Sequence, residues 1–84
     1  MTEHYFSGTV ERIIFENASN FFKILLLEIE ETNAPDFDDF EIIITGTMAD
    51  IMEGEDYTFW GQLTQHPKYG EQLKASRYER AQLT

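Results

Sequence analysis

The 84-residue sequence contains no cysteine, only two prolines, and six basic residues against sixteen acidic ones. Without cysteine the fold has neither disulfides nor thiolate metal ligands, and a reducing compartment is compatible with the composition. The segment Met1–Tyr5 lacks the basic start and apolar core of a signal peptide. No apolar run approaches the roughly 18 residues that indicate a membrane span. We therefore expect an untargeted, cytoplasmic chain without a membrane partner.

Motifs for catalysis are also missing. None of the lysines stands in the Gly-x-x-x-x-Gly-Lys-Ser/Thr context of a phosphate-binding loop, and no Gly-x-Ser-x-Gly turn accompanies the two histidines, His4 and His66. The acidic stretch 36–41 lacks the glycine and the distant glutamate of a calcium loop, and two isolated histidines do not make a zinc site. We predict no catalytic residue, no metal site and no cofactor in these 84 residues.

Charge is distributed unevenly around a formal net charge of -10. Eleven acidic residues and no Lys or Arg lie from Glu28 to Asp56, whereas His66 to Arg80 holds four basic residues and two acidic ones. Affinity for nucleic acid grows with the number of Lys and Arg contacts to phosphate. The acidic middle therefore argues against a broad phosphate-binding surface, and the basic end stays compatible with a local one.

The first residues with a clear pattern predict a bent strand over 5–15. Phe6, Gly8 and Val10 share one face, after which the apolar positions shift to Ile13 and Phe15. Such a shift predicts a β-bulge near residues 11–12, and bulges coil a strand as a small closed or half-closed barrel requires. Gly8 within the strand permits a tight bend or the close approach of another backbone.

Four further strands follow from the same reasoning. Residues 21–29 predict a second strand after a polar turn, although so apolar a run would also suit a buried helix. An acidic loop over 30–39 leads to a third strand with Phe40, Ile42, Ile44 and Gly46 on one face. Residues 48–55 are too short for a full helix and end in a turn. Two strands around a turn at 66–70 complete an all-β domain.

The last hairpin supplies the candidate binding residues. Trp60 alternates with Tyr57, Phe59 and Leu63, so it is expected to face outward. Aromatic residues beside Lys and Arg can stack bases and contact phosphates of a single strand, although they can equally cover a thin core. For Tyr78, as for the others, both interpretations stay open. The predicted nucleic-acid or partner contacts are Trp60, His66, Lys68, Tyr69, Lys74 and Arg77.

Several short motifs can be read together: Gly8-x-Val10-x-x-Ile13-x-Phe15-x-Asn17, Asn20-Phe21-Phe22-Lys23-Ile24, Ile44-Thr45-Gly46, Gly54-Glu55, Gly61 and His66-Pro67-Lys68-Tyr69-Gly70-Glu71-Gln72-Leu73. With them nearly the whole chain resembles the N-terminal domain of the bacterial RecD-like ATP-dependent DNA helicases (exodeoxyribonuclease V alpha-subunit-like), the form found outside the RecBCD complex. The most specific piece is 66–70 with Gln72. The chain departs from the family at Leu73, where an aromatic is allowed, and at Asn20-Phe21, where glycine often precedes the phenylalanine.

The resemblance implies a small five-stranded OB-like Greek-key barrel with a bulged first strand. In relatives this barrel precedes a helix-hairpin-helix region and a superfamily-one motor that uses ATP and Mg²⁺ to unwind DNA from five-prime to three-prime. The end of the sequence, without a turn signal or a closing helix, predicts that 1–84 is a single domain at the N-terminus of a longer helicase chain.

Three functions remain open at this point. The first is a non-catalytic accessory module in DNA repair or recombination, which docks to the parent's motor or to another repair protein and guides single-stranded DNA. The second is an independent single-strand-binding module, and the third is a stand-alone interaction domain with an acidic face. OB-folds bind oligonucleotides across strands two and three, and because that region is acidic here, we expect its carboxylates to repel phosphates.

Overall fold

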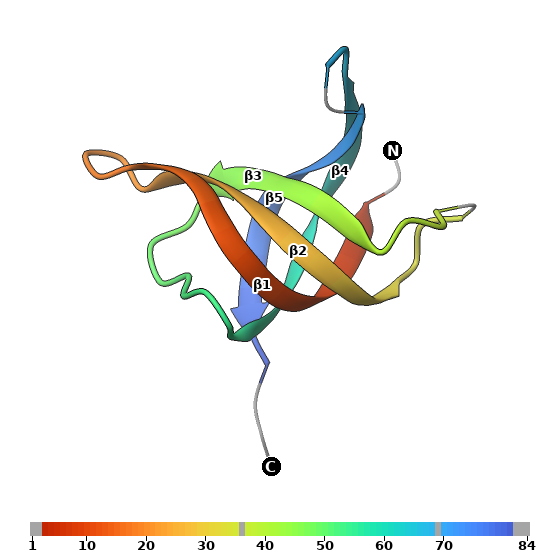
Figure 1. The fold of residues 1–84 in the computed structure, drawn as a ribbon, viewed down its shortest axis with the longest axis horizontal. Coiled ribbons are helices and arrows are strands. Elements are labelled where there is room, and N and C mark those ends of the chain that lie inside the picture. The colour runs from red at the N-terminus through yellow and green to blue at the C-terminus, as the bar shows by residue number, and fades with distance from the viewer. Residues whose placement is uncertain (1–2, 36, 69, 82–84) are drawn as a thin grey trace.

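The computed structural model describes residues 3–35, 37–68 and 70–81, and its five strands form a closed barrel (Figure 1). Around the barrel the order is β1-β2-β3-β5-β4, and β4 pairs with β1 to close it. All neighbours are antiparallel except β3 and β5. The described residues include no helix. The strands are β1 (His4–Asn17), β2 (Phe22–Thr32), β3 (Glu41–Thr47), β4 (Asp56–His66) and β5 (Gly70–Arg80).

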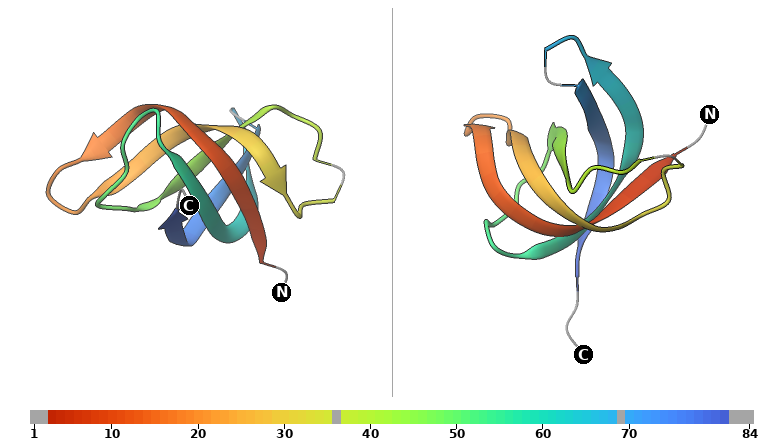
Figure 2. Two further views of the ribbon diagram at one scale, coloured as in Figure 1. Left: turned by 90° about the horizontal axis from the view of Figure 1, so that it is seen from below. Right: turned by 45° about the vertical axis from the view of Figure 1, so that its right-hand side comes forward.

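The long first strand serves both sides of the barrel. Its register with β2 runs from Phe6 to Asn17, and its register with β4 from His4 to Thr9. The pairing with β2 shifts between Val10 and Arg12, which confirms the predicted bulge at 11–12. Two more shifts, after residues 7 and 13, add to the coiling that lets one strand turn round the barrel (Figure 2).

Two glycines let backbones pass at close range. A Cβ built on Gly8 would overlap the carbonyl oxygen of Glu28, and one on Gly61 would overlap the carbonyl oxygen of Lys74. The expectation that Gly8 admits a close backbone is confirmed. Each glycine lies next to a register shift, Gly8 in the pairing of β1 with β2 and Gly61 in the pairing of β4 with β5.

The interior is filled from alternate positions of each strand. Phe6, Val10, Leu25, Ile44 and Phe59 are all fully buried. In β2, Leu25 and Leu27 point inward while their neighbours point outward, so the apolar run is a strand with two apolar faces. This confirms the predicted second strand and excludes the helix.

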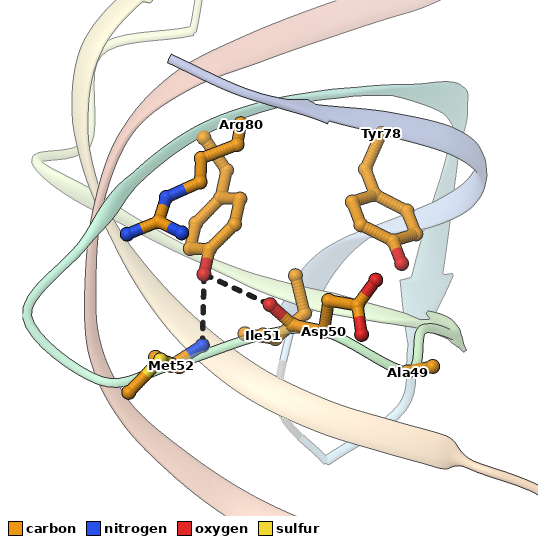
Figure 3. A pocket seen from close by; sticks show the side chains of 7 residues that line it. Ala49, Asp50, Ile51, Met52, Tyr78 and Arg80 are labelled. Carbon is orange, nitrogen blue, oxygen red and sulfur yellow. Dashed lines mark hydrogen bonds between the residues drawn. The ribbon is translucent and has the colours of Figure 1, made fainter. Parts of the chain in front are cut away.

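The end of the barrel between β3 and β4 is closed by a loop. Met48 and Ile51 are buried there. The Tyr57 hydroxyl accepts a hydrogen bond from the backbone N–H of Met52 (2.9 Å) and donates one to the carbonyl of Asp50 (3.1 Å), as Figure 3 shows. The prediction that 48–55 is too short for a helix and ends in a turn is confirmed.

The predicted start of the third strand was wrong by one residue. Phe40 lies in a bend before β3 and is 85% exposed, whereas the inward face begins with Ile42. The interior position at this end belongs to Phe37, whose ring packs edge-on against Phe6 with 5.1 Å between ring centres. The second strand also runs further than predicted, to Thr32, which shortens the acidic loop.

Candidate functional site

The outer surface of β4 and β5 carries an aromatic ring beneath a cation. The guanidinium carbon of Arg77 lies 4.1 Å from the ring centre of Trp60, its register partner across the two strands. Trp60 is half-buried and Arg77 exposed. At this distance the cation is attracted to the ring face, and the pair holds both side chains in place. Trp60 faces outward, as predicted.

Lys74 extends this surface along β5. It is exposed, pairs in register with Gln62 of β4, and lies beside Thr45 of β3. Between Lys74 and Arg77 the strand is bulged, and the Ser76 hydroxyl donates a hydrogen bond of 3.3 Å to the carbonyl of Trp60. Two cations and one indole ring therefore share one face of the barrel.

Two other candidates, His66 and Lys68, lie at the tip of the β4–β5 hairpin. His66 and Lys68 are exposed, and the His66 Nδ1 accepts a 3.0 Å hydrogen bond from the backbone N–H of Lys68. The bond closes the turn, which agrees with the turn role expected for His66. Tyr69 falls outside the described residues. Sequence reasoning thus predicted one group where the structure has two, a strand face and a turn.

Tyr78 belongs to neither group. Its ring packs against the buried Phe59, with 6.3 Å between ring centres, on the inner side of β5. Of the two interpretations left open for Tyr78, this packing favours the core, because the bulge after Ala75 reverses the side of the strand on which each following residue lies. For this residue the core interpretation is correct.

Sequence reasoning missed an apolar groove on the outer face of β1, β2, β3 and β5. Its volume is about 640 Å³. The apolar walls are Ile14, Phe22, Ile24, Leu26 and Ile43, and the polar edge consists of Arg12, Thr45, His66 and Gln72. The signal was present in the sequence: the second and third strands carry apolar residues at outward positions, where a barrel surface would alternate with polar ones.

The expected carboxylates lie beside the groove: Asp39, Glu41 and Glu71 line a neighbouring pocket that shares Leu26 and Ile43 with it. None of the residues that line the groove in the described ranges is acidic. Glu41 begins β3 and is the register partner of Glu28, which lies within β2 beyond the groove. Nearby, a hydrogen bond to the Glu41 carboxyl is the main cause that raises the pKa of Glu11. The parts of β2 and β3 that line the groove are apolar, and a count of acidic residues over 28–56 does not show where each of them lies on the strands.

The β1–β2 turn is held by a buried cation. Lys23 is 1% exposed, and its Nζ lies 2.7 Å from Glu16 Oε2 in an ion pair that lacks the alignment of a hydrogen bond. Phe21 precedes this pair with φ at 62°, the left-handed region. Its ring centre lies 5.8 Å from the Lys23 ammonium.

A closed five-stranded barrel of this strand order, with a groove over strands two and three, defines the OB-fold class. The comparison with known families agrees: the family model of the OB-fold domain of the ATP-dependent DNA helicase YrrC matches residues 3–82. The chain belongs to this family, as the resemblance to RecD-like helicases predicted. No solved structure matches the chain significantly.

No helix among the described residues has the length and apolar character needed to cross a membrane. Within the same ranges, no three His, Cys, Asp or Glu side chains gather in a way that could hold a metal ion.

Proposed function

We propose that the domain is a non-catalytic accessory module at the N-terminus of a longer DNA helicase chain that acts in DNA repair or recombination. It docks to the motor of that chain or to another repair protein, and its β4–β5 face guides single-stranded DNA. The ATP and Mg²⁺ of the reaction belong to the motor, since these residues contain no phosphate-binding loop. A cytoplasmic location fits this role.

The observation that carries the proposal is the Trp60–Arg77 pair with Lys74 beside it. A ring that is already oriented and partly desolvated can stack on a base at a low entropic cost. The two cations lie on the same face and can meet the flanking phosphates. The acidic residues around Glu28 and Glu41 lie elsewhere on the barrel and keep the overall affinity low.

A titration with a single-stranded oligonucleotide at low salt tests this role. Trp60 is the only tryptophan, so stacking on it quenches the intrinsic fluorescence of the domain. We expect a dissociation constant on the order of micromolar. The slope of the logarithm of the binding constant against the logarithm of the salt concentration should be about -0.7 for each phosphate contacted. Arg77→Ala should weaken binding at least fivefold by the same readout. Trp60→Ala removes the tryptophan signal, so its binding is followed by the anisotropy of a fluorescently labelled oligonucleotide, and it should also be at least fivefold weaker.

Arg80→Ala is the matched control. It removes the same charge from the same strand, but Arg80 is paired with Glu55 at 2.9 Å on the other side of β5. Its loss should leave the affinity within twofold. Binding that responds equally to both arginine variants, or no quenching at low salt, would contradict a DNA-guiding role for this face.

A further inference from the structure

The apolar groove on β1, β2, β3 and β5 adjoins a pocket of about 400 Å³ that carries negative charge. The two hollows share Leu26 and Ile43 as lining residues. Three exposed carboxylates and one exposed ring line the second hollow, which we call the acidic pocket: Asp39, Glu41, Glu71 and Phe40. Apolar side chains and carboxylates therefore form one continuous surface with two chemistries.

The acidic pocket favours a cation as its ligand. Glu28 and Glu41 are exposed register partners across β2 and β3, and like charges directly opposite one another destabilise a sheet. The sequence has no Lys or Arg from Glu28 to Asp56. The ring of Phe40 is 85% exposed, and an aromatic face attracts a cation. A Lys or Arg side chain from a partner would offset the repulsion and contact this ring.

The size of the groove suits a short peptide segment. Its volume of about 640 Å³ lies within the range of about 300–1,000 Å³ that is typical of pockets for small ligands. A stable contact between folded proteins buries about 1,200–2,000 Å² in total, whereas a few anchoring side chains carry most of the binding energy. An apolar side chain in the groove and a cation in the acidic pocket make two such anchors.

The edge of β1 that faces away from β2 leaves little room for an added strand. Beyond its pairing with β4 this edge meets no other strand among the described residues, but the loop before β4 covers it. The Val10 N–H donates to the carbonyl of Glu55 at 3.0 Å, and the Ile13 N–H donates to the Glu53 carboxylate at 2.8 Å. A second copy therefore gains no backbone bonds there, and it would bring another formal charge of -10.

The described chain leaves the barrel far from the acidic pocket. β5 begins at Gly70, and Glu71 next to it lines the pocket. The strand ends at Arg80, and at a rise of about 3.3 Å per residue its two ends lie about 30 Å apart. A segment of another protein therefore reaches the pocket more directly than the residues beside Arg80 do.

We infer that the groove and the acidic pocket together bind a short basic segment of another protein, with an apolar side chain in the groove and a Lys or Arg in the pocket. The inference rests on the proposed function, in which the domain docks to another repair protein, and it names the chemistry of that partner. Thr45 at the groove edge pairs in register with Lys74, so the segment borders the face proposed to guide DNA. Charge separates the two ligands, because the carboxylates attract the segment and repel phosphates, whereas Lys74 does the reverse.

Two fluorescein-labelled peptides test the inference by fluorescence anisotropy at low salt. The probe is Gly-Leu-Arg-Leu-Arg-Gly, and the control Gly-Ser-Arg-Ser-Arg-Gly has the same charge without the apolar side chains. The isolated domain can be used, because its strands pair only with one another around their own core. We expect the probe to bind with a dissociation constant on the order of tens of micromolar, as for a small transient contact, and the control about tenfold more weakly.

Matched variants on β5 locate the cation. Glu71→Gln removes a carboxylate from the acidic pocket and should weaken binding of the probe about threefold, the size expected of one exposed ion pair. Glu79→Gln removes the same charge from the same strand, but it lies in another hollow beside Thr58, so binding should be unchanged.

A variant of the groove wall locates the apolar side chain. Ile24→Ser should weaken binding of the probe about fivefold and leave binding of the serine control unchanged. If Ile24→Ser does not fold by circular dichroism, the difference between the two peptides on the unmodified domain tests the apolar contact alone.

Three results with the peptides would overturn the inference. Equal binding of the two peptides means that only the net charge attracts them. Equal losses for Glu71→Gln and Glu79→Gln mean that the cation does not enter the acidic pocket. Binding to the isolated domain that is absent in the full helicase means that the helicase's own chain fills the surface.

Two further results would assign the groove to another occupant. A loss of oligonucleotide affinity in Ile24→Ser as large as that in Arg77→Ala means that nucleic acid occupies the groove. Self-association in analytical ultracentrifugation that Ile24→Ser abolishes means that a second copy does. The DNA-guiding role is judged separately, by quenching of Trp60 with oligonucleotide, which Glu71→Gln should not weaken, so each proposal can fail without the other.

Discussion

The backbone N–H of Met48 donates a 2.9 Å hydrogen bond to the carbonyl oxygen of Phe21, which ties the β1–β2 turn to the end of β3. The Phe21 N–H in turn donates to the carbonyl of Asn17 at 2.8 Å. Phe21 makes both bonds in the left-handed conformation, with φ at 62°. A bulky residue there is strained by about 1–3 kcal/mol. The surrounding contacts therefore hold an exposed aromatic ring where glycine would be relaxed.

Phe21→Gly should stabilise the domain. Glycine enters the left-handed region without steric cost, and the lost ring is 49% exposed. The relief of strain outweighs the greater freedom of glycine in the unfolded chain, and we expect the free energy of unfolding to rise by about 0.5–1 kcal/mol.

Phe15→Gly is the control, because that ring is also 49% exposed but lies in an extended strand. It should lower stability by about 1 kcal/mol in the same urea titration. A fall of similar size for both variants would mean that Phe21 is unstrained.

Removing Glu16 from its ion pair with the buried Lys23 should destabilise the domain more than removing Lys23 does. Glu16→Gln leaves an ammonium group buried without its partner and should cost about 1–3 kcal/mol, less than for a fully buried pair because the Glu16 side chain is 50% exposed. Lys23→Met removes the buried charge and leaves a carboxylate that water can reach, so it should be neutral within about 1 kcal/mol. In a double-mutant cycle, Glu16→Gln should cost nothing in the Lys23→Met background. An equal cost there would assign the effect of Glu16 to other contacts.

Gly8 and Gly54 are glycines for two different physical reasons, which substitution by alanine can distinguish. Gly8→Ala drives a methyl group into the carbonyl of Glu28 within the barrel wall, and because backbone cannot move aside we expect a loss above about 3 kcal/mol or failure to fold. Gly54→Ala meets no atom within 4 Å, but φ is 86°, so only conformational strain of about 1 kcal/mol applies. Chemical denaturation of both variants checks the order. Similar small losses would show that β1 and β2 can separate at Gly8.

The sequence predicts the features of the fold that neighbouring residues determine, and it does not predict those that join strands distant in the chain. Alternation along 5–15 and 57–64 depends on neighbouring residues alone, so the strands and the bulge at 11–12 could be predicted. The outward apolar residues of β2 and β3 were visible in the sequence, but their assembly into one groove could not be predicted, because the groove joins Ile14, Ile24 and Ile43 from three strands whose register is set by closure. The position of Tyr78 depends on a bulge that no local pattern marks. Trp60 was identified correctly, and its pairing with Arg77 required the register of β4 and β5.

Acidification should strengthen the contact between Glu11 and Glu41. A hydrogen bond between the two carboxyl groups is the main cause that raises the pKa of Glu11 in the folded protein, followed by desolvation and the charges of Glu41 and Glu28. A raised folded pKa means that the native state binds the proton more tightly than the unfolded chain. The contribution to stability is therefore full below the unfolded pKa and is lost as the pH rises through the folded pKa. The pH range over which this stabilisation is lost therefore lies above the ordinary pKa of glutamate.

Glu41→Gln removes the second carboxylate, so the pKa of Glu11 measured by carboxyl-carbon NMR should move down toward the ordinary glutamate pKa. Glu79→Gln on β5 should leave the pKa of Glu11 unchanged. A Glu11 titration that is the same in all three proteins would show that the pair shares no proton.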